Sequence, residues 1–282
     1  MASVLITGTS KGIGFETALA FGRAGHKVYA TMRNPSQSPL LAETAAWENL
    51  PVTISKMDVD SDQSVNEAIA AILKGNGSID VLVNNAGVEA VGSVEELPLT
   101  AFRAVMETNY FGPLRCIQAL LPHLRRQRSG CIINVSSVAG RLCCPPLTSY
   151  CASKWALEAL TEGLAGEMRT FNVRVASVEP GIIDTSMATR IEHPAAESQY
   201  RQSERFVALY ANAAKTPVSP SLVAAKILEV AESGSWQLRH PVGPDAFPFL
   251  KWRSGMTDED WVEMNAGDDA TFFSRLSEVN KN

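Results

Sequence analysis

No apolar run in the 282 residues is long enough to span a membrane, so the sequence predicts no transmembrane helix. It predicts no signal peptide either, because an apolar strand-like segment begins almost at residue 2. Basic residues are not in excess, and the net charge of −5 argues against nucleic acid as the main partner. The most basic run, residues 125–128, is interpreted as a solvated helix end in preference to a binding patch. We therefore expect a cytoplasmic protein with a small-molecule partner.

Spacings that hold metal ions are missing as well. The five cysteines are odd in number and show no C-x-x-C pair, which favours small buried residues in a reducing compartment over metal ligands. The four histidines are scattered along the chain, and no H-x-x-x-H pair occurs. The sequence therefore predicts no metal site.

Apolar, β-branched runs alternate with segments of helical period along most of the chain. The runs are apolar nearly throughout, as expected for strands that are covered on both faces. This alternation predicts an α/β fold of the Rossmann type, a doubly wound parallel sheet flanked by helices in one domain over residues 1–282, with its ligand crevice at the carboxyl ends of the strands. The predicted strands are Ala2–Thr7, Lys27–Met32, Val52–Met57, Val81–Asn84, Cys131–Val135 and Val173–Val178, and the predicted helices are Gly14–Ala24, Ser61–Leu73, Thr100–Arg126, Tyr150–Thr170 and Ser219–Ser233.

Two segments fit this alternation less cleanly. Residues 186–220 are polar and irregular, with aromatic residues at helical spacing, and are interpreted as a helical substrate lid. Residues 241–282 form a C-terminal extension, in which Thr257–Asp260 resembles a helix start with acidic residues in its first turn. Covering a substrate site and packing at the periphery are equally compatible with both segments.

The first predicted strand runs directly into a glycine-rich turn, Thr7-Gly-Thr-Ser-Lys-Gly-Ile-Gly14, at which a helix begins. Glycine lets the backbone turn sharply and approach a pyrophosphate, and the free N–H groups of the helix start point toward its charge. A strand, glycine turn and helix in this order predict a dinucleotide site. Its predicted contacts in the turn are Gly8, Thr9, Ser10, Lys11, Gly12, Ile13 and Gly14.

The charge pattern after the second strand favours NADP(H) over NAD(H). NAD-binding proteins typically place a carboxylate there to accept hydrogen bonds from the ribose. This chain has Arg33 there, no acidic residue from 26 to 42, and Lys11 in the glycine turn. An arginine fork binds the oxygens of a 2′-phosphate, which a carboxylate would repel. The alternative is that Arg33 is merely solvated.

Tyr150 and Lys154 are four residues apart on a predicted helix, so both side chains project from one face. An ammonium about 5 Å from a phenol, at an effective dielectric constant of about 20, favours the phenolate by roughly 3 kcal/mol, or about two pKa units. The pair is thus expected to act as a general acid or base. Ser137 follows the fifth strand, at its carboxyl end. Ser136 is its rival for a place in the site, although strand geometry would point it to the opposite side.

The glycine turn, Asn84-Asn-Ala-Gly87, Ser137 and Tyr150-x-x-x-Lys154, in this order, resemble the single-domain members of the short-chain dehydrogenase/reductase family. The resemblance covers at least Ala2–Thr185, and it is greatest to members that act on steroids, retinoids and other bulky apolar carbonyls. It implies that Asn109 interrupts a helix and holds a water next to Lys154, that Lys154 binds the nicotinamide ribose beside Tyr150, and that helices matching Thr100–Arg126 and Tyr150–Thr170 form a homodimer or homotetramer. The further cofactor contacts that it implies are Asp58, Val59, Asn85, Ala86, Gly87, Pro180, Gly181, Ile183 and Thr185.

The expected function is that of an NADP(H)-dependent oxidoreductase that interconverts an apolar ketone or aldehyde and an alcohol by hydride transfer. Ser137 is expected to hold the substrate oxygen and Tyr150 to protonate it, while Lys154 tunes Tyr150 and Asn109 connects the site to water. Two alternatives stay open. One is a non-catalytic dinucleotide-binding regulator or scaffold, and the other is an epimerase or dehydratase on the same fold.

Overall fold

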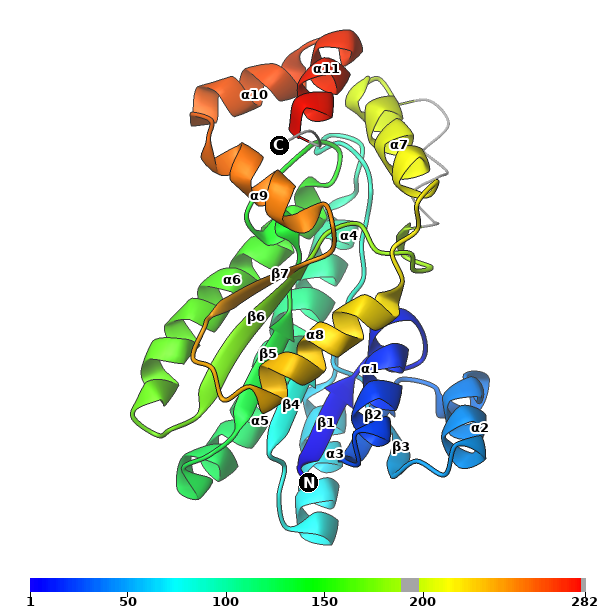
Figure 1. Cartoon of the computed structure of the whole chain (residues 1–282), viewed down its shortest axis with the longest axis vertical. Helices are drawn as coiled ribbons and strands as arrows, with labels where there is room; N and C mark the ends of the chain where they lie inside the picture. The colour runs from blue at the N-terminus through cyan, green and yellow to red at the C-terminus, as the bar shows by residue number, and fades with distance from the viewer. Residues whose placement is uncertain (189–197, 280–282) are drawn as a thin grey trace.

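The central element of the computed structural model, which describes residues 1–188 and 198–279, is a parallel sheet of seven strands (Figure 1). Its strand order is β3-β2-β1-β4-β5-β6-β7, so the direction of winding reverses between β1 and β4. Such a reversal opens a crevice at the carboxyl ends of the strands. The strands are β1 (Ser3–Thr7), β2 (Lys27–Met32), β3 (Val52–Lys56), β4 (Val81–Asn84), β5 (Cys131–Val135), β6 (Arg174–Pro180) and β7 (Arg239–Val242).

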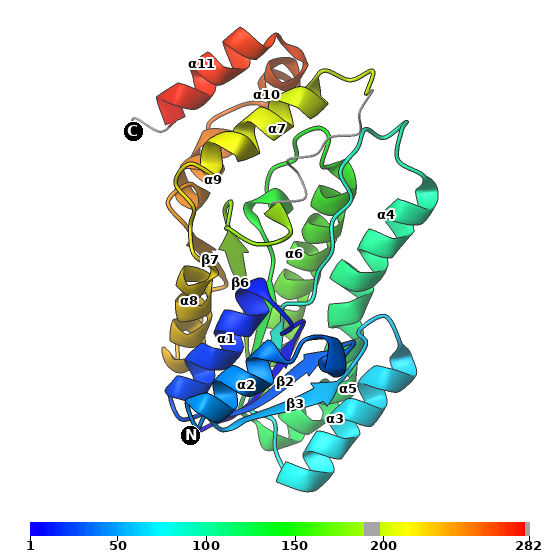
Figure 2. The ribbon, with the colours of Figure 1, turned by 90° about the vertical axis from the view of Figure 1, so that its right-hand side faces the viewer.

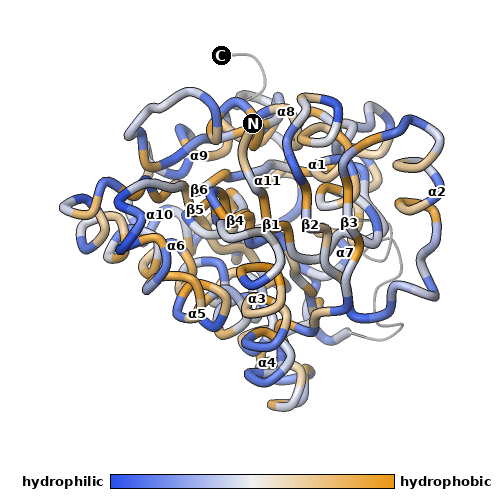
Figure 3. The backbone as a smooth tube through the Cα atoms, turned by 90° about the horizontal axis from the view of Figure 1, so that it is seen from below, coloured by the Kyte–Doolittle hydropathy of each residue, from blue (hydrophilic) through white to orange (hydrophobic). Residues whose placement is uncertain are grey.

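Helices cover both faces of the sheet, which confirms the doubly wound arrangement (Figure 2). One face packs against α1 and α8, and the other against α3, α5 and α6. Central strands β1, β4 and β5 are buried along their whole length and consist mostly of hydrophobic residues, which Figure 3 colours orange. The flanking helices are α1 (Gly12–Arg23), α2 (Leu40–Trp47), α3 (Asp62–Asn76), α4 (Leu99–Met106), α5 (Gly112–Gln127), α6 (Thr148–Arg169) and α8 (Pro220–Glu232).

The long helix that the sequence predicts over Thr100–Arg126 is divided in the structure. A π-helical turn at Glu107–Phe111 separates α4 from α5. A π turn inserts an extra residue into the helix, and such turns are frequent at functional sites. The interruption at Asn109 that the family resemblance implies is therefore present in the backbone.

A helical cap stands over the carboxyl edge of the sheet, built from α7 (Gln202–Ala213), α9 (Ala246–Ser254), α10 (Asp258–Ala266) and α11 (Asp269–Val279) (Figures 1 and 2). The expected helix start at Thr257 is confirmed, since its Oγ1 accepts a hydrogen bond of 3.1 Å from the Asp260 N–H at the start of α10. Part of the predicted lid, residues 189–197, lies outside the described residues. Within the described ranges, every helix is too short or too polar to cross a membrane.

Candidate active site

A cavity of about 540 Å³ runs along the carboxyl ends of the strands, from the glycine turn to the helical cap. One part of it is lined by Gly8, Ser10, Lys11, Gly12 and Ile13, the end of β2 and residues 85–89. The predicted contacts Thr9 and Gly14 do not line it, and the buried Thr9 hydroxyl donates to the Thr31 carbonyl oxygen at 3.2 Å. Ser137, Tyr150 and Lys154 line the middle. Apolar side chains of the cap line the far part, which includes Phe206, Leu209, Phe249, Trp252, Trp261 and Phe272. The cavity thus joins residues that are far apart in the sequence.

The glycine turn leaves no room for side chains at two of its positions. Gly8 has a φ of +71°, and a Cβ there would lie 2.7 Å from the Cα of Ala86. A Cβ on Gly14 would lie 2.3 Å from the Gly8 carbonyl oxygen and 2.4 Å from the Asn85 Nδ2. Contacts this short exclude any larger residue. The backbone of the turn is therefore exposed to the cavity at the N-terminus of α1, where a phosphate is favoured.

Hydrogen bonds connect the segment Asn84–Gly87, at the end of β4, to this turn. The Asn85 Nδ2 donates to the carbonyl oxygens of Thr7 and Gly8 at 2.9 and 3.0 Å. In return, the Thr7 hydroxyl oxygen accepts from the backbone N–H groups of Asn85 and Ala86, both at 3.0 Å. These bonds satisfy buried backbone groups of two neighbouring strand ends and hold the cavity wall in place.

Arg33 is exposed at the edge of the cavity, which Lys11 also lines. Asp58 and Val59 lie across from them at the end of β3, as the resemblance implies. The sequence analysis missed Asp60, which also lines the cavity and accepts a hydrogen bond of 3.1 Å from the Thr108 hydroxyl. Burial raises the pKa of the Asp60 carboxyl, and the positive charge of Arg33 opposes that rise. The carboxylates of Asp58 and Asp60 both follow β3. The segment after β2, up to residue 42, therefore contributes only the positive charge of Arg33.

Ser137 and Ser136 are directed to different places, as strand alternation predicts. The Ser137 hydroxyl hydrogen-bonds to Tyr150, and its Oγ accepts from the Ala139 N–H at 3.1 Å. Ser136 Oγ is buried beneath the short 3₁₀ turn Val138–Gly140, where a Cβ on Gly140 would lie 2.8 Å from it. The structure therefore brings Ser137, and not Ser136, together with Tyr150.

Lys154 lies one turn after Tyr150 on α6 and is 4% exposed. Its Nζ lies 5.6 Å from the centre of the Tyr150 ring and donates to the Val135 carbonyl oxygen at 2.8 Å. Burial lowers the pKa of Lys154 to about 8, and the negative charge of Glu158 opposes this effect.

The expected depression of the Tyr150 pKa is wrong for this structure. Burial raises the pKa of Tyr150 above that of a free tyrosine, the negative charge of Glu89 raises it further, and the hydrogen bond with Ser137 offsets only part of the rise. The distance argument assumed an ammonium directed at the phenol, whereas the Lys154 Nζ donates to a backbone carbonyl. It also left out the cost of placing a phenolate in a site with little water.

Asn109 is fully buried in the π turn and makes three hydrogen bonds. Its Oδ1 accepts from the Val88 N–H at 2.9 Å, and its Nδ2 donates to the Val88 carbonyl oxygen at 2.8 Å and to the Ser153 Oγ at 2.9 Å. Ser153 in turn donates to the Tyr150 carbonyl oxygen at 2.7 Å. Asn109 thus links the segment after β4 to the helix that carries Tyr150 and Lys154.

The loop after β6 is held by a residue that the sequence analysis missed. Pro180, Gly181, Ile183 and Thr185 all line the cavity, as the resemblance implies. The Ile182 N–H donates to Asp245 Oδ2 at 2.8 Å, and a Cβ on Gly181 would lie 2.0 Å from Asp245 Oδ1. Asp245 is 63 residues from Ile182 and stands at the start of α9, so no local pattern connects the two.

The described part of the predicted lid and the C-terminal extension both border the cavity. Phe206 and Tyr210 of α7 lie with ring centres 4.7 Å apart, next to the segment that carries Tyr150. Trp252 of α9, Trp261 of α10 and Phe272 of α11 form edge-to-face contacts and pack on Leu142 of the loop after Ser137. Both segments therefore contribute to the cavity wall, and their action as a cover over a substrate stays a prediction.

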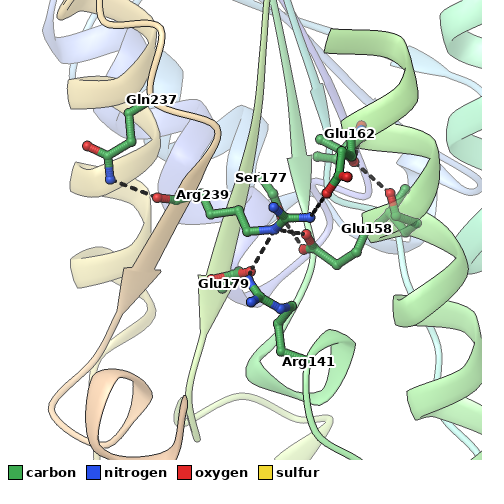
Figure 4. Close-up of polar contacts among 10 residues, drawn as sticks. Arg141, Glu158, Glu162, Ser177, Glu179, Gln237 and Arg239 are labelled. Carbon is green, nitrogen blue, oxygen red and sulfur yellow. Dashed lines mark hydrogen bonds and ion pairs between the residues drawn. The ribbon is translucent and has the colours of Figure 1, made fainter. Parts of the chain in front are cut away.

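A buried ionic network lies directly behind the site (Figure 4). Glu158 of α6 accepts hydrogen bonds from the Ser177 hydroxyl and, at 2.9 Å, from the Arg239 Nε. The fully buried Glu179 of β6 lies 3.4 Å from the Arg141 Nη1 and 3.7 Å from the Arg239 Nε. Within the described residues, Glu179 Oε2 has no hydrogen-bond partner. The two buried carboxylates of Glu158 and Glu179 thus face the partly exposed guanidinium of Arg239, behind the loops that carry Ser137 and Gly181.

Glu179 predicts a pH dependence of stability. Burial, and then the charge of Glu158, raise the pKa of Glu179 to about 7. The folded protein keeps this proton at pH values where the unfolded chain has lost it, so stability falls as the pH rises from about 4.5 to about 7. Glu179→Gln should remove this contribution, which is on the order of 3 kcal/mol. We expect the melting temperature of the variant, relative to that of the wild type, to increase between pH 5 and pH 7.5. If the melting temperatures of the two proteins change in parallel over this range, the assignment to Glu179 is wrong.

Known proteins share the sequence pattern of this chain. The family model described as short chain dehydrogenase matches residues 2–196. Retinol dehydrogenase 8 of Bos taurus is 42% identical over 194 residues, which are 67% of this chain and 61% of that protein, so less than two thirds of that relative is matched. The uncharacterized oxidoreductase YusZ of Bacillus subtilis (strain 168) is 33% identical over 268 residues, 89% of this chain and 95% of that protein.

Among solved structures, a short-chain dehydrogenase from Streptomyces avermitilis has a TM-score of 0.79 and 30% sequence identity. That likeness covers 94% of this chain and 96% of the other, so it extends over most of the helical cap. The family match itself spans the glycine turn, Asn84–Gly87, Ser137, Tyr150 and Lys154. The chain therefore belongs to the short-chain dehydrogenase family of oxidoreductases.

Proposed function

We propose that this protein is an NADP(H)-dependent oxidoreductase that interconverts a bulky apolar ketone or aldehyde and the corresponding alcohol. The observation that carries the proposal is the single cavity. It connects a glycine turn that suits a pyrophosphate, the Ser137–Tyr150–Lys154 group and an aromatic end that suits an apolar molecule. A cofactor and a substrate that enter from opposite ends would meet beside Tyr150.

The residues present fit a nicotinamide dinucleotide. Side chains on Gly8 and Gly14 would collide with neighbouring backbone, so the turn keeps its N–H groups open for phosphate. Lys154 and Tyr150 would hold the nicotinamide ribose, and the loop at Pro180, Gly181, Ile183 and Thr185 would hold the carboxamide. When bound, the dinucleotide supplies or accepts the hydride, while the protein supplies position and electrostatic field.

A preference for NADP(H) is supported by the charge at the end of β2. Arg33 and Lys11 both border the cavity, and residues 26–42 contain no carboxylate that would repel a 2′-phosphate. The carboxylates of Asp58 and Asp60 follow β3 instead, where an adenine would lie. Arginine and lysine together can neutralise most of the phosphate charge through charge-assisted hydrogen bonds.

The protonation of the site suits carbonyl reduction. The phenol of Tyr150 holds a proton at neutral pH, as a free tyrosine does, and so has one to donate. Burial raises its pKa and makes it a weaker acid, so proton transfer depends on a positive charge that favours the phenolate. We propose that Ser137 donates a hydrogen bond to the carbonyl oxygen while Tyr150 transfers its proton to that oxygen. Lys154 would favour the phenolate that results, and the bonds from Asn109 to Val88 and Ser153 would keep the helix of Tyr150 in register.

The aromatic end of the cavity supports an apolar substrate. Phe206, Phe249, Trp252, Trp261 and Phe272 line it, and aromatic and aliphatic walls favour molecules that lose little hydration on binding. Retinol, in the name of the Bos taurus relative, is an alcohol of this apolar class. We propose a substrate with a carbonyl at one end and an extended or ring-containing hydrocarbon body.

The test is consumption of NADPH, followed by absorbance, with a panel of carbonyl compounds. We expect kcat/KM to rise with the apolar area of the ketone or aldehyde, and to be higher with NADPH than with NADH. Small polar aldehydes serve as the matched control for reactivity without apolar contact. NADPH binding without turnover on any member of the panel would overturn the proposal and favour the non-catalytic regulator.

A further inference from the structure

We propose that Glu158 is a positioning residue for Lys154: its carboxylate keeps the lysine ammonium charged, and its bonds to Ser177 and Arg239 hold the catalytic helix against the sheet. The inference rests on the proposed function for its meaning in catalysis, since Lys154 acts there beside Tyr150. The electrostatic part concerns Lys154 itself and can be measured without turnover.

The first observation is the position of Glu158 on α6 relative to Lys154. Tyr150, Lys154 and Glu158 follow one another at four-residue intervals on α6, so the three side chains lie on one face of the helix. Lys154 and Glu158 are each 4% exposed. A buried ammonium is costly unless a negative charge lies near it. Glu158 places a buried carboxylate in the adjacent turn, where it lies beyond ion-pair contact with the Lys154 Nζ and is held by Arg239.

The second observation is that Glu158 is rigidly held. Ser177 of β6 and Arg239 of β7 donate to its two carboxylate oxygens (Figure 4). A Cβ on Gly140 would lie 2.9 Å from Glu158 Cγ and 3.1 Å from the Lys154 carbonyl oxygen, so the turn after Ser137 packs tightly on this part of α6. Neither oxygen of Glu158 can turn away without breaking a buried hydrogen bond.

Several helices and strands contribute polar or charged groups around Lys154 and Glu158. Lys154 faces Tyr150 and Glu158 on its own helix and the Val135 carbonyl on β5, to which its Nζ donates at 2.8 Å. Burial lowers the pKa of Lys154 to about 8, and the charge of Glu158 is what opposes this fall. Around Glu158 stand four further ionisable groups: Arg239 of β7, Glu179 of β6, Glu162 of α6 and, through Glu179, Arg141.

Glu162 offers a matched control on the same helix. It also pairs with Arg239, at 2.7 Å through Nη2, but its side chain is 65% exposed and lies two turns from Lys154. Replacing Glu162 by glutamine perturbs the same ion-pair network around Arg239 as replacing Glu158 does. It also changes the net charge of the protein by the same amount. Solvent screens Glu162, so its effect on Lys154 should be small.

The experiment is an NMR pH titration of the full chain with lysine labelled with ¹³C at Cε, in which Lys154→Met assigns the Lys154 signal. We expect Glu158→Gln to lower the titration midpoint of Lys154 by about one pH unit. Glu162→Gln should leave the midpoint unchanged. Glutamine keeps the size of glutamate and can still bond to Ser177 and Arg239, so the fold should survive. Glu158→Asp, which keeps the charge, should move the midpoint less.

An unchanged midpoint in Glu158→Gln, or an equal shift in Glu162→Gln, would overturn the inference. If Glu158→Gln does not fold, Glu158→Met, which also removes the charge, takes its place: a lowered midpoint supports the inference and an unchanged one overturns it. The proposed function is tested separately, because the titration needs no substrate. If the Lys154 midpoint shifts in Glu158→Gln but the wild type reduces no carbonyl compound, only the proposed function is refuted. If the midpoint does not shift but the wild type is an active reductase, only this inference is refuted.

Discussion

Tyr150→Phe is expected to lower kcat for carbonyl reduction about 10³-fold, while the dissociation constant for NADPH changes by less than a factor of about three. Phenylalanine keeps the ring that packs with Ala139 and Leu147 and removes only the hydroxyl that bonds to Ser137. The substrate oxygen then loses its proton donor, and Ser137 loses its partner. Steady-state kinetics at saturating NADPH measure the loss, and fluorescence titration of NADPH measures binding.

Tyr210→Phe is the matched control. Tyr210 also lines the cavity, lies near Tyr150 and has a pKa that burial raises, so the same hydroxyl is removed from a similar environment. We expect its kcat to stay within about threefold of the wild type, because its hydroxyl is not paired with Ser137 in the proposed mechanism. Retained turnover in Tyr150→Phe, or an equal loss in both variants, would remove Tyr150 as the acid.

Local patterns were sufficient to predict most of the sheet and its main helices. Strands such as Ser3–Thr7 and Cys131–Val135 are buried on both faces, so their apolar runs are visible in the sequence. The glycine turn is recognisable from its local order of strand, glycines and helix start, although Asn85 and Ala86, which help to forbid a Cβ there, are distant in the sequence.

Elements whose structure depends on distant partners were missed. β7, Arg239–Val242, is a four-residue edge strand that contains a proline, and its burial alternates. Proline is tolerated there because an edge strand has unpaired positions, but it argues against a strand in the sequence. α2 was missed as well, since few of its residues are buried.

The site shows the same limit. The types and order of Ser137, Tyr150 and Lys154 could be read from motifs, but the direction of the Tyr150 pKa could not. That direction is set by burial beneath segments more than 50 residues away, such as Phe206 and Tyr210 of α7. Asp245 was invisible for the same reason, since its partner, the Ile182 N–H, is brought to it by the pairing of β6 with β7.

Arg33→Asp is expected to reverse the cofactor preference. Losing the guanidinium removes a charge-assisted contact worth about 1.5–3 kcal/mol, and the new carboxylate repels the 2′-phosphate, so the dissociation constant for NADPH should rise about 100-fold. The same carboxylate can accept hydrogen bonds from the ribose hydroxyls of NADH. We therefore expect the affinity for NADH to hold or increase, as measured by fluorescence titration of both cofactors.

Arg125→Asp separates this local effect from net charge. Arg125 is exposed in the last turn of α5, and it does not line the cavity. The substitution changes the net charge by the same amount, so a general loss of attraction for a polyanion would appear in both variants. If Arg33→Asp affects NADPH no more than Arg125→Asp does, then Arg33 is a solvated surface residue and the stretch after β2 does not select the phosphate. A hundredfold loss confined to Arg33→Asp, with NADH retained, places the 2′-phosphate beside that guanidinium, because NADPH and NADH differ only in that group.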